Sequence, residues 1–279
     1  MTIIADSGST KTIWMVVETG NKIVTEGLNP HFTTDEAFLT ACQTVCKQFS
    51  VLGSQFSITF YGSGCGNSTQ RQRVTSILAN AFGTSNIHVE TDMLGACRAV
   101  SGNRPSLVGI LGTGSNACYY DGKNIQYCAV STGYILGDEG SANYVGRRLL
   151  QDYLTHNMPR QISSRFHDAY PMTHEEFIDA VYHQPNPNRF LASLGQFAVE
   201  HINDDYCSSE ILVSLYEWYN YQLDNIQKLS HCNTLNLVGG FATHIKSLLE
   251  IVTKDHGVII KNVVADPIDG LRKYHKANP

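Results

Sequence analysis

Short apolar segments rich in β-branched and aromatic residues open the chain. Residues 3–6, 12–19 and 22–27 are such segments, and turn-forming Gly, Ser, Thr and Asn residues separate them. Strands favour these apolar side chains, and Gly and Asn favour the turns between strands. The pattern predicts three consecutive strands connected as a meander.

A helical period follows the meander. In residues 34–53 apolar side chains recur every three or four positions, which predicts an amphipathic helix capped by Thr34 or Asp35. The predicted buried face consists of Phe38, Cys42, Val45, Cys46 and Phe49.

Strands and helices then alternate up to residue 102. Residues 56–66 read as a strand that enters a Gly-rich turn, and residues 68–83 as a helix that ends at Gly83. Residues 86–102 read as a short strand followed by a helix. This alternation predicts an α/β fold.

The opening pattern returns at residues 106–133. An apolar strand again runs into a Gly/Ser/Thr turn, a second strand reaches a Gly-containing turn, and a third strand follows. Identity between the copies is low, but the order of elements is the same. We therefore predict two related lobes, each with a strand–turn–strand loop.

The remainder is mostly helical before it returns to strands. Helices are predicted at 141–154, 173–183, 188–202 and 208–230. A strand, glycine turn and helix follow at 234–252, and a closing strand and tail at 257–275. The aromatic residues of the 208–230 helix are expected in the core and at an interface, which favours a homodimer: Tyr216, Trp218, Tyr219 and Tyr221.

Length and composition bound the architecture. A chain of 279 residues exceeds the usual size of one domain, and 42% hydrophobic with 16% charged residues is an ordinary globular balance. We expect two lobes, residues 1–104 and 105–279, with a cleft between them.

Charge and cysteine usage exclude several classes of protein. The formal net charge of −5 argues against a nucleic-acid binder. The eight cysteines form no CxxC pair, which disfavours a zinc site or an iron–sulfur cluster and fits free thiols in a reducing cytosol. No apolar run approaches the roughly 20 residues that span a bilayer. We expect a cytoplasmic protein without a membrane partner.

The first turn, DSGSTKT at residues 6–12, is the first candidate for chemistry. Backbone N–H groups of a tight Gly/Ser/Thr turn form an anion site, to which the hydroxyls of Ser7, Ser9 and Thr10 add donors and Lys11 adds a cation. Asp6 would repel a phosphate unless Mg²⁺ or its water shell lay between them. A plain β-hairpin turn is the alternative. P-loop and dinucleotide-fold explanations are weaker, because GxxxxGK[ST] is missing and no GxGxxG opens a helix.

The ordered set DSGSTKT, TDMLGA, LGTGSN, LGDEGSA and LVGGF resembles the sugar kinase/Hsp70/actin superfamily. More narrowly, the chain resembles the N-acetylglucosamine kinase group of the BadF/BadG/BcrA/BcrD ATPase family, from residue 3 to about 270. The resemblance implies a two-lobed actin-like ATPase fold related to ribonuclease H, with ATP and Mg²⁺ as cofactors. Asp6 would contact the metal through water.

The same resemblance assigns the remaining site residues. ATP contacts are implied for Ser9, Thr10, Lys11, Thr113, Gly114, Gly239 and Gly240. Sugar contacts are implied for Asn29, Ser63, Gly64, Ser115, Asn116, Gly133, Tyr134 and Asp138. Asp92 matches the catalytic aspartate.

Asp92 and Asp138 could also have purely structural roles. Asp92 could simply cap its helix, although a carboxylate at a strand end can also take the proton of an attacking sugar hydroxyl. Asp138 is predicted as a helix N-cap and Glu139 as a first-turn residue, and Asp138 could cap and bind sugar at once. Glycoside hydrolysis by this pair is disfavoured, because adjacent residues rarely face a cleft from opposite sides.

The sequence therefore predicts an ATP-dependent amino-sugar kinase, with N-acetylglucosamine as the leading substrate and its 6-phosphate as the product. An ATPase that activates a partner redox protein is the first alternative. A non-catalytic sugar-sensing regulator is the second, although we expect no room for its usual DNA-binding segment before residue 3.

Overall fold

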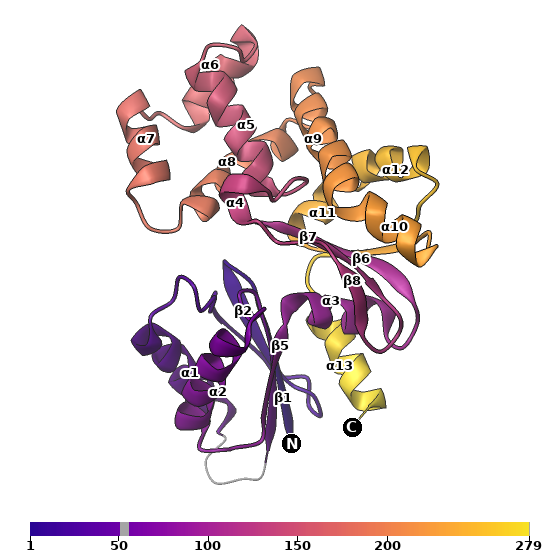
Figure 1. The fold of residues 1–279 in the computed structure, drawn as a ribbon. Helices are drawn as coiled ribbons and strands as arrows, with labels where there is room; N and C mark the ends of the chain where they lie inside the picture. Colours follow the sequence, from indigo (N-terminus) through magenta and orange to yellow (C-terminus); the bar gives the residue numbers. More distant parts are fainter. Residues whose placement is uncertain (51–55, 279) are drawn as a thin grey trace. The chain divides into compact units, whose positions relative to one another are not determined.

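The computed structural model describes residues 1–50 and 56–278, and its chain divides into two compact units (Figure 1). The first comprises Met1–Arg104, Gly122–Asn124 and Asp266–Pro279, and the second comprises Pro105–Asp121 and Ile125–Ala265. The expected lobe 105–279 thus differs from the second unit, since its last residues pack with the first unit.

The first unit is built on a mixed five-stranded sheet in the order β3-β2-β1-β4-β5. Its strands are β1 (Thr2–Ser7), β2 (Lys11–Val16), β3 (Lys22–Glu26), β4 (Ser57–Gly62) and β5 (Ile87–Thr91). The predicted meander is confirmed, because β1, β2 and β3 pair antiparallel. Strands β4 and β5 run parallel to β1, so β1, β4 and β5 end at one edge of the sheet.

Alternating side chains of these strands supply two apolar layers. Ile3 and Trp14 pack in one cluster with α1 (Asp35–Phe49) and α2 (Ser68–Phe82). Ile4 and Met15, one position along, belong to the cluster on the opposite face, which contains residues of the C-terminal helix. Successive strand side chains point to opposite faces, so a period of two produces both layers.

The helix predictions for this unit are confirmed. Helix α1 has Thr34 as its N-cap and buries Phe38, Cys42, Val45 and Cys46. Its end at Phe49, with Ser50 as the C-cap, is earlier than predicted, and Phe49 is only partly buried. Residues 51–53 of the predicted helix lie outside the described residues. Helix α2 ends at Gly83, whose φ of 67° is readily adopted only without a Cβ. Helix α3 (Asp92–Ser101) follows β5 directly.

The second unit repeats the sheet of the first. Its order, β10-β9-β6-β7-β8, matches β5-β4-β1-β2-β3 position by position, with the same antiparallel and parallel pairings. The strands are β6 (Ser106–Leu111), β7 (Ser115–Tyr120), β8 (Ile125–Cys128), β9 (Thr234–Val238) and β10 (Ile259–Val264). The predicted duplication is confirmed.

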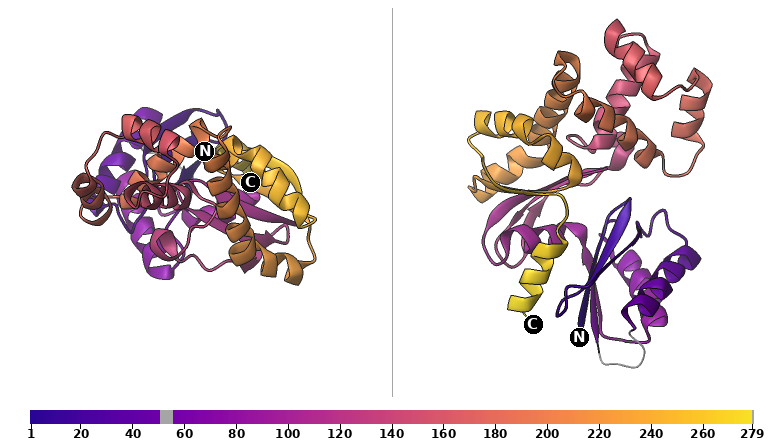
Figure 2. Two further views of the ribbon diagram at one scale, coloured as in Figure 1. Left: turned by 90° about the horizontal axis from the view of Figure 1, so that it is seen from above. Right: turned by 180° about the vertical axis from the view of Figure 1, so that it is seen from behind.

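Helices make up the rest of the second unit (Figure 2). They are α4 (Gly133–Leu136), α5 (Ala142–Leu154), α6 (Arg160–Ala169), α7 (His174–Tyr182), α8 (Pro187–Glu200), α9 (Asp205–Trp218), α10 (Asp224–Ser230), α11 (Gly240–His244) and α12 (Lys246–Asp255). Sequence periodicity did not predict α4 or α6. The predicted helix 208–230 is interrupted by a π-helical turn, η1 (Tyr219–Leu223). Of its four aromatic residues, Trp218 and Tyr219 are buried, whereas Tyr221 is 73% exposed.

The end of the chain corrects a prediction. The expected tail after the last strand is a helix, α13 (Ile268–Ala277), which packs beside α3 in the first unit (Figure 1). Ile268 and Leu271 are fully buried there. A short segment with only two core positions gives too weak a period to reveal a helix from sequence.

Arg98, Tyr61 and His275 connect α3, β4 and α13. Arg98 Nη1 donates to Tyr61 Oη at 2.9 Å, and Tyr61 Oη lies 2.9 Å from His275 Nε2. Because the tyrosine oxygen accepts from Arg98, its own proton points to the imidazole. Burial and the Arg98 charge lower the pKa of His275 to about 4.

No helix among the described residues is long and apolar enough to cross a membrane.

His275 should make stability depend on pH. Its ordinary pKa of about 6.5 exceeds the folded value, so the unfolded chain binds the extra proton in mildly acid solution. The contribution is complete above about pH 6.5 and is lost as the pH falls towards 4. We expect wild type to lose more unfolding free energy between pH 7.5 and 5 than His275→Gln does, as measured by urea denaturation. The exposed His174→Gln is the control, and equal losses in wild type and His275→Gln would contradict the assignment.

Candidate functional site

The first candidate loop joins β1 to β2. Gly8 N donates to the Lys11 carbonyl at 3.0 Å, which closes the turn, and Gly27 N donates to the Thr10 carbonyl at 3.0 Å. Ser7 is fully buried, and its hydroxyl contacts Thr12 Oγ1 at 2.8 Å and accepts from Leu28 N. The expectation that Ser7 offers a phosphate donor is therefore wrong. Ser9 and Thr10 occupy the turn itself, and Lys11 is exposed at the start of β2.

Carboxylates crowd the sheet edge beside this loop. Burial, followed by the negative charges of Asp92 and Asp266, raises the pKa of Asp6 to about 7, against a lowering effect of Lys11. Lys11 Nζ lies 3.9 Å from Asp266 Oδ2. A divalent cation would relieve the repulsion between these carboxylates. Among described residues, no group of three or more His, Cys, Asp and Glu could hold a metal directly.

Asp92 is the first residue of α3 but not its cap. Thr91 fills the N-cap, with its hydroxyl accepting from Leu94 N at 3.2 Å, so the alternative that Asp92 is the N-cap is wrong. Asp92 Oδ1 accepts from Met93 N at 2.8 Å. Burial raises the pKa of Asp92, and hydrogen bonds from the backbone and the Ser63 hydroxyl oppose that rise. The carboxyl is thus desolvated and held at the end of a strand, as a proton acceptor requires.

Three of the predicted sugar contacts gather beside Asp92. Asn29, which is 6% exposed, donates from Nδ2 to Ser63 Oγ at 3.4 Å and accepts from His31 N at 2.9 Å. Gly64 has a φ of 82°, and a Cβ there would lie 2.4 Å from Asn29 Oδ1. Asn29, Ser63, Gly64 and Asp92 therefore form a connected polar cluster in the first unit.

The second candidate loop joins β6 to β7 and is anchored to α5. Ala142 N donates to the Gly112 carbonyl at 3.0 Å, and Asn143 N donates to the Thr113 carbonyl at 3.1 Å. A Cβ on Gly114 would lie 2.9 Å from Asp138 Oδ2. Gly114 thus permits the close approach of the Asp138 carboxylate to the loop.

Asp138 joins this loop to α5 without capping the helix. It accepts from Ser115 N at 3.3 Å and from Asn143 Nδ2 at 2.7 Å, and burial raises its pKa. The N-cap is Ser141, so the prediction for Asp138 is wrong. Glu139 also precedes the helix, and its predicted first-turn place is wrong.

The other predicted contacts in the second unit lie at two further places. Asn116 follows Ser115 on β7, and its side-chain oxygen accepts from Ala117 N at 2.8 Å. Gly133 and Tyr134 begin α4, where Arg147 Nη1 donates to the Tyr134 carbonyl at 3.3 Å. In the described chain, no hydrogen bond joins Gly133 or Tyr134 to the Ser115–Asp138 pair.

The predicted adenosine turn lies against the second loop. Gly239 has a φ of 135°, and a Cβ there would lie 2.1 Å from the Leu111 carbonyl oxygen, so only glycine fits. Gly240 begins α11, and an added Cβ would meet no atom within 4 Å. Bare backbone at the ends of β6 and β9 therefore leaves this edge open to a ligand.

Sequence reasoning missed several polar residues near these loops. Asn143 and Gln222 hydrogen-bond to Asp138 and Ser115, and Asp266 acts on Asp6. One sequence signal existed, because Ser214, Trp218 and Gln222 recur every four positions. The aromatic content of that helix concealed it.

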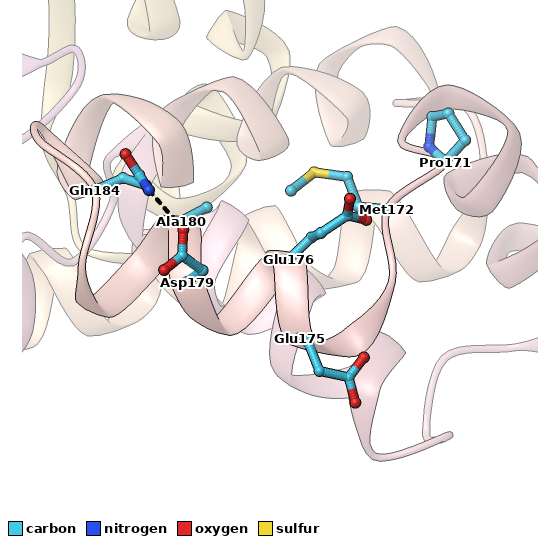
Figure 3. Close-up of a pocket in the computed structure, with 7 residues that line it drawn as sticks. All are labelled: Pro171, Met172, Glu175, Glu176, Asp179, Ala180 and Gln184. Carbon is cyan, nitrogen blue, oxygen red and sulfur yellow. Dashed lines mark hydrogen bonds between the residues drawn. The ribbon is translucent and has the colours of Figure 1, made fainter.

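A surface pocket of about 560 Å³ lies elsewhere, along α7 (Figure 3). Its lining consists of Pro171, Met172, Glu175, Glu176, Asp179, Ala180 and Gln184. It contains none of the predicted site residues, and its three carboxylates would repel a nucleotide phosphate.

Duplicated sheets with a strand–turn–strand loop in each unit define the fold of sugar kinases and actin-like ATPases. Residues 5–270 match the model of the BadF/BadG/BcrA/BcrD ATPase family, and the chain belongs to this family. No curated protein matches the sequence significantly.

Solved structures agree with this assignment. A proposed N-acetylglucosamine kinase from Porphyromonas gingivalis is 32% identical, with a TM-score of 0.92 over 100% of this chain and 99% of that chain. A second proposed N-acetylglucosamine kinase, from Chromobacterium violaceum, is 17% identical, with a TM-score of 0.73 over 98% of each chain. A ROK family glucokinase from Streptomyces griseus, in complex with glucose and AMPPNP, is 14% identical, with a TM-score of 0.58 over 99% of this chain and 98% of that chain. The fold predicted from the sequence motifs is confirmed.

The crowding of carboxylates is directly measurable. In the metal-free protein we expect the Asp6 carboxyl to titrate near pH 7, as followed by ¹³C NMR with Asp6→Asn identifying the resonance. Asp92→Asn should lower this pKa because it removes a like charge, and Lys11→Met should raise it because it removes the opposite charge. Asp205→Asn, in the second unit, is the control. An Asp6 that titrates near pH 4 would show that its environment is not desolvated.

Proposed function

We propose that this protein is an ATP-dependent amino-sugar kinase that phosphorylates N-acetylglucosamine to its 6-phosphate. The observation that carries the proposal is Asp92: a buried carboxyl at a strand end, bonded within a cluster of sugar-type contacts and beside the Asp6 loop. The likeness to the Porphyromonas gingivalis protein supports the choice of sugar.

Asp92 acts as the general base. Its carboxylate takes the proton of the sugar C6 hydroxyl as that oxygen attacks the γ-phosphorus of ATP; an O–P bond forms, the bond to the β-phosphate oxygen breaks, and ADP leaves. The raised pKa of Asp92 makes it a better proton acceptor near neutral pH than an exposed aspartate. In phosphoryl transfer of this kind, most of the rate comes from positioning and charge stabilisation.

Each of the two loops offers backbone and small side chains to nucleotide phosphate. Ser9, Thr10 and Lys11 of the first loop and Thr113 and Gly114 of the second donate to phosphate oxygens. Glycines 239 and 240 lie against the adenosine. Asp6 would hold Mg²⁺ through water, and the metal would neutralise part of the phosphate charge. The unrelieved repulsion among Asp6, Asp92 and Asp266 fits such a cation.

Each unit carries residues predicted to contact the sugar. Asn29, Ser63 and Gly64 supply the cluster next to Asp92, where the buried amide of Asn29 is already fixed by two hydrogen bonds. The second unit supplies Ser115, Asn116, Gly133, Tyr134 and Asp138. Pre-organised polar groups of this kind discriminate between sugars that differ in one substituent.

A coupled assay of ADP release tests the proposal. N-acetylglucosamine, glucosamine, N-acetylmuramic acid and N-acetylmannosamine are each supplied with ATP and Mg²⁺, and the phosphorylated product is identified by mass spectrometry. We expect release to require a sugar and to be fastest with N-acetylglucosamine. Release at the same rate without any sugar would point to an ATPase of another kind.

Asp92→Asn separates catalysis from binding. We expect turnover to fall by roughly 10²–10⁴-fold, because an amide cannot take the proton, while calorimetric affinities for ATP and sugar stay close to those of wild type. The matched control is Asp205→Asn, since Asp205 is likewise the first residue of a helix, α9. Turnover of Asp92→Asn within about tenfold of wild type would reduce Asp92 to a structural residue.

Asp6→Asn tests the metal contact. Removing the negative charge should raise the Mg²⁺ concentration needed for half-maximal activity and lower turnover, while sugar affinity stays unchanged. Activity is measured against Mg²⁺ at saturating ATP and sugar. The exposed Asp269→Asn is the control, and an unchanged Mg²⁺ requirement in Asp6→Asn would remove Asp6 from the metal site.

A further inference from the structure

One face of α9 and η1 contacts the segment before α5 and the start of β7 through three residues spaced four apart. Ser214 Oγ accepts from Gly140 N at 2.8 Å. Trp218 is fully buried, and a Cβ added to Gly140 would lie 2.7 Å from its Cβ. Gln222 continues this face and reaches the β7 end of the loop. The segment therefore supports the residues proposed to bind sugar.

Gln222 lies in the π-helical turn η1, which packs against β7. A π turn inserts one extra residue per turn and shifts the side chains that follow it, and such turns are frequent at functional sites. Gln222 is half-buried between Tyr221, which is exposed, and Leu223, which is fully buried. The turn thus places a long polar side chain beside a polar loop.

The hydrogen bonds of Gln222 determine the orientation of its amide. Nε2 donates to Ser115 Oγ at 2.9 Å and to Glu139 Oε2 at 3.0 Å, which uses both amide hydrogens. The reverse orientation would set the amide oxygen against the Glu139 carboxylate. Oε1 is buried and has no hydrogen-bond partner within the described chain. A buried oxygen without a partner costs stability, a cost typical of functional sites.

This orientation also determines the role of the Ser115 hydroxyl. A hydroxyl has one hydrogen, and an oxygen that accepts from Gln222 directs this hydrogen elsewhere. Within the described residues, no side chain or carbonyl accepts it. The Ser115 hydroxyl is left as a donor with no acceptor of its own.

We propose that Gln222 is a positioning residue that fixes the Ser115 hydroxyl as a hydrogen-bond donor to an acceptor oxygen of the sugar. The inference rests on the proposed function, which places Ser115 at the sugar, and extends it to a residue that does not itself touch substrate. Glu139 helps to fix the Gln222 side chain, because its carboxylate accepts the second amide hydrogen of Gln222.

Two substitutions of similar length separate this role from packing. Gln222→Glu replaces the amide donor with a carboxylate, which accepts the Ser115 proton and so draws it away from the sugar, and which also loses the hydrogen bond to Glu139. We expect the KM for N-acetylglucosamine to rise about two- to tenfold, the worth of one hydrogen bond, while kcat and the KM for ATP change less than about twofold. Gln222→Met leaves the hydroxyl free to rotate, so its KM should rise less than that of Gln222→Glu.

A double-mutant cycle tests whether the effect passes through Ser115. Ser115→Ala should raise the sugar KM, and adding Gln222→Glu or Gln222→Met to it should raise it no further. Gln227→Glu is the matched control, because Gln227 lies one turn beyond on α10 and its oxygen already accepts from Tyr219 Oη. Circular dichroism checks folding. If Gln222→Glu does not fold, the double-mutant cycle is measured with Gln222→Met and Ser115→Ala.

Three outcomes would overturn the inference: a wild-type sugar KM in Gln222→Glu, equal effects of the Glu and Met variants, or additive effects with Ser115→Ala. Each requires a wild-type enzyme that phosphorylates the sugar, so they leave the proposed function intact. A wild-type protein that neither binds nor phosphorylates any amino sugar would instead remove the proposed function and this inference together.

Discussion

The parallel pairing of β1, β4 and β5 is the constraint on which the first half of the site depends. Parallel strands end at one edge, so Asp6 and the residues after Gly62 and Thr91 must lie near one another. The chain thereby concentrates carboxylates where burial already disfavours charge, which is why Asp6 has a pKa near 7. Folding alone does not relieve this repulsion. A bound cation, together with an anionic ligand, would relieve the repulsion.

The second unit uses the same sheet topology for a different purpose. Its loop after β6 and its turn after β9 also meet at one edge, where Gly239 lies so close to the Leu111 carbonyl oxygen that a Cβ would not fit, and where Gly114 makes room for the Asp138 carboxylate. The first unit therefore gathers Asp6, Asp92 and Asp266, whereas the second combines glycine backbone with the Asp138 carboxylate. A kinase needs both, a base with its metal and a cradle for phosphate and adenosine.

Support for the polar loops comes from helices outside the repeated core. Helix α3 carries Asp92 and is braced by α13 through Arg98, Tyr61 and His275. Helix α9 and the turn η1 brace the Asp138 segment and Ser115. In both units, residues proposed to bind substrate are held by neighbouring residues that do not touch the substrate. Such supporting contacts determine the geometry of a site.

The sequence by itself determined the elements whose signals are local. The strand meander, the helices α1 and α2, and the repeated strand–turn–strand order follow from periods of two and of three to four and from turn residues within a few positions. Of the caps, the sequence offered Thr34 or Asp35 for α1 and Gly83 for α2. The ordered motifs also identified the family and its fold. Only the tertiary structure showed that the Ser7 hydroxyl is hydrogen-bonded to Thr12 and Leu28. It also showed that Thr91 and Ser141, not Asp92 and Asp138, are the N-caps, and that the C-terminal tail forms helix α13. Leu28 and the elements that pack against α13 lie far away in the chain, and a local pattern carries no record of a distant partner. Thr91 and Ser141 instead bond to the residue three positions on, but each stands near an aspartate that also favours capping, and only the backbone geometry distinguishes the two.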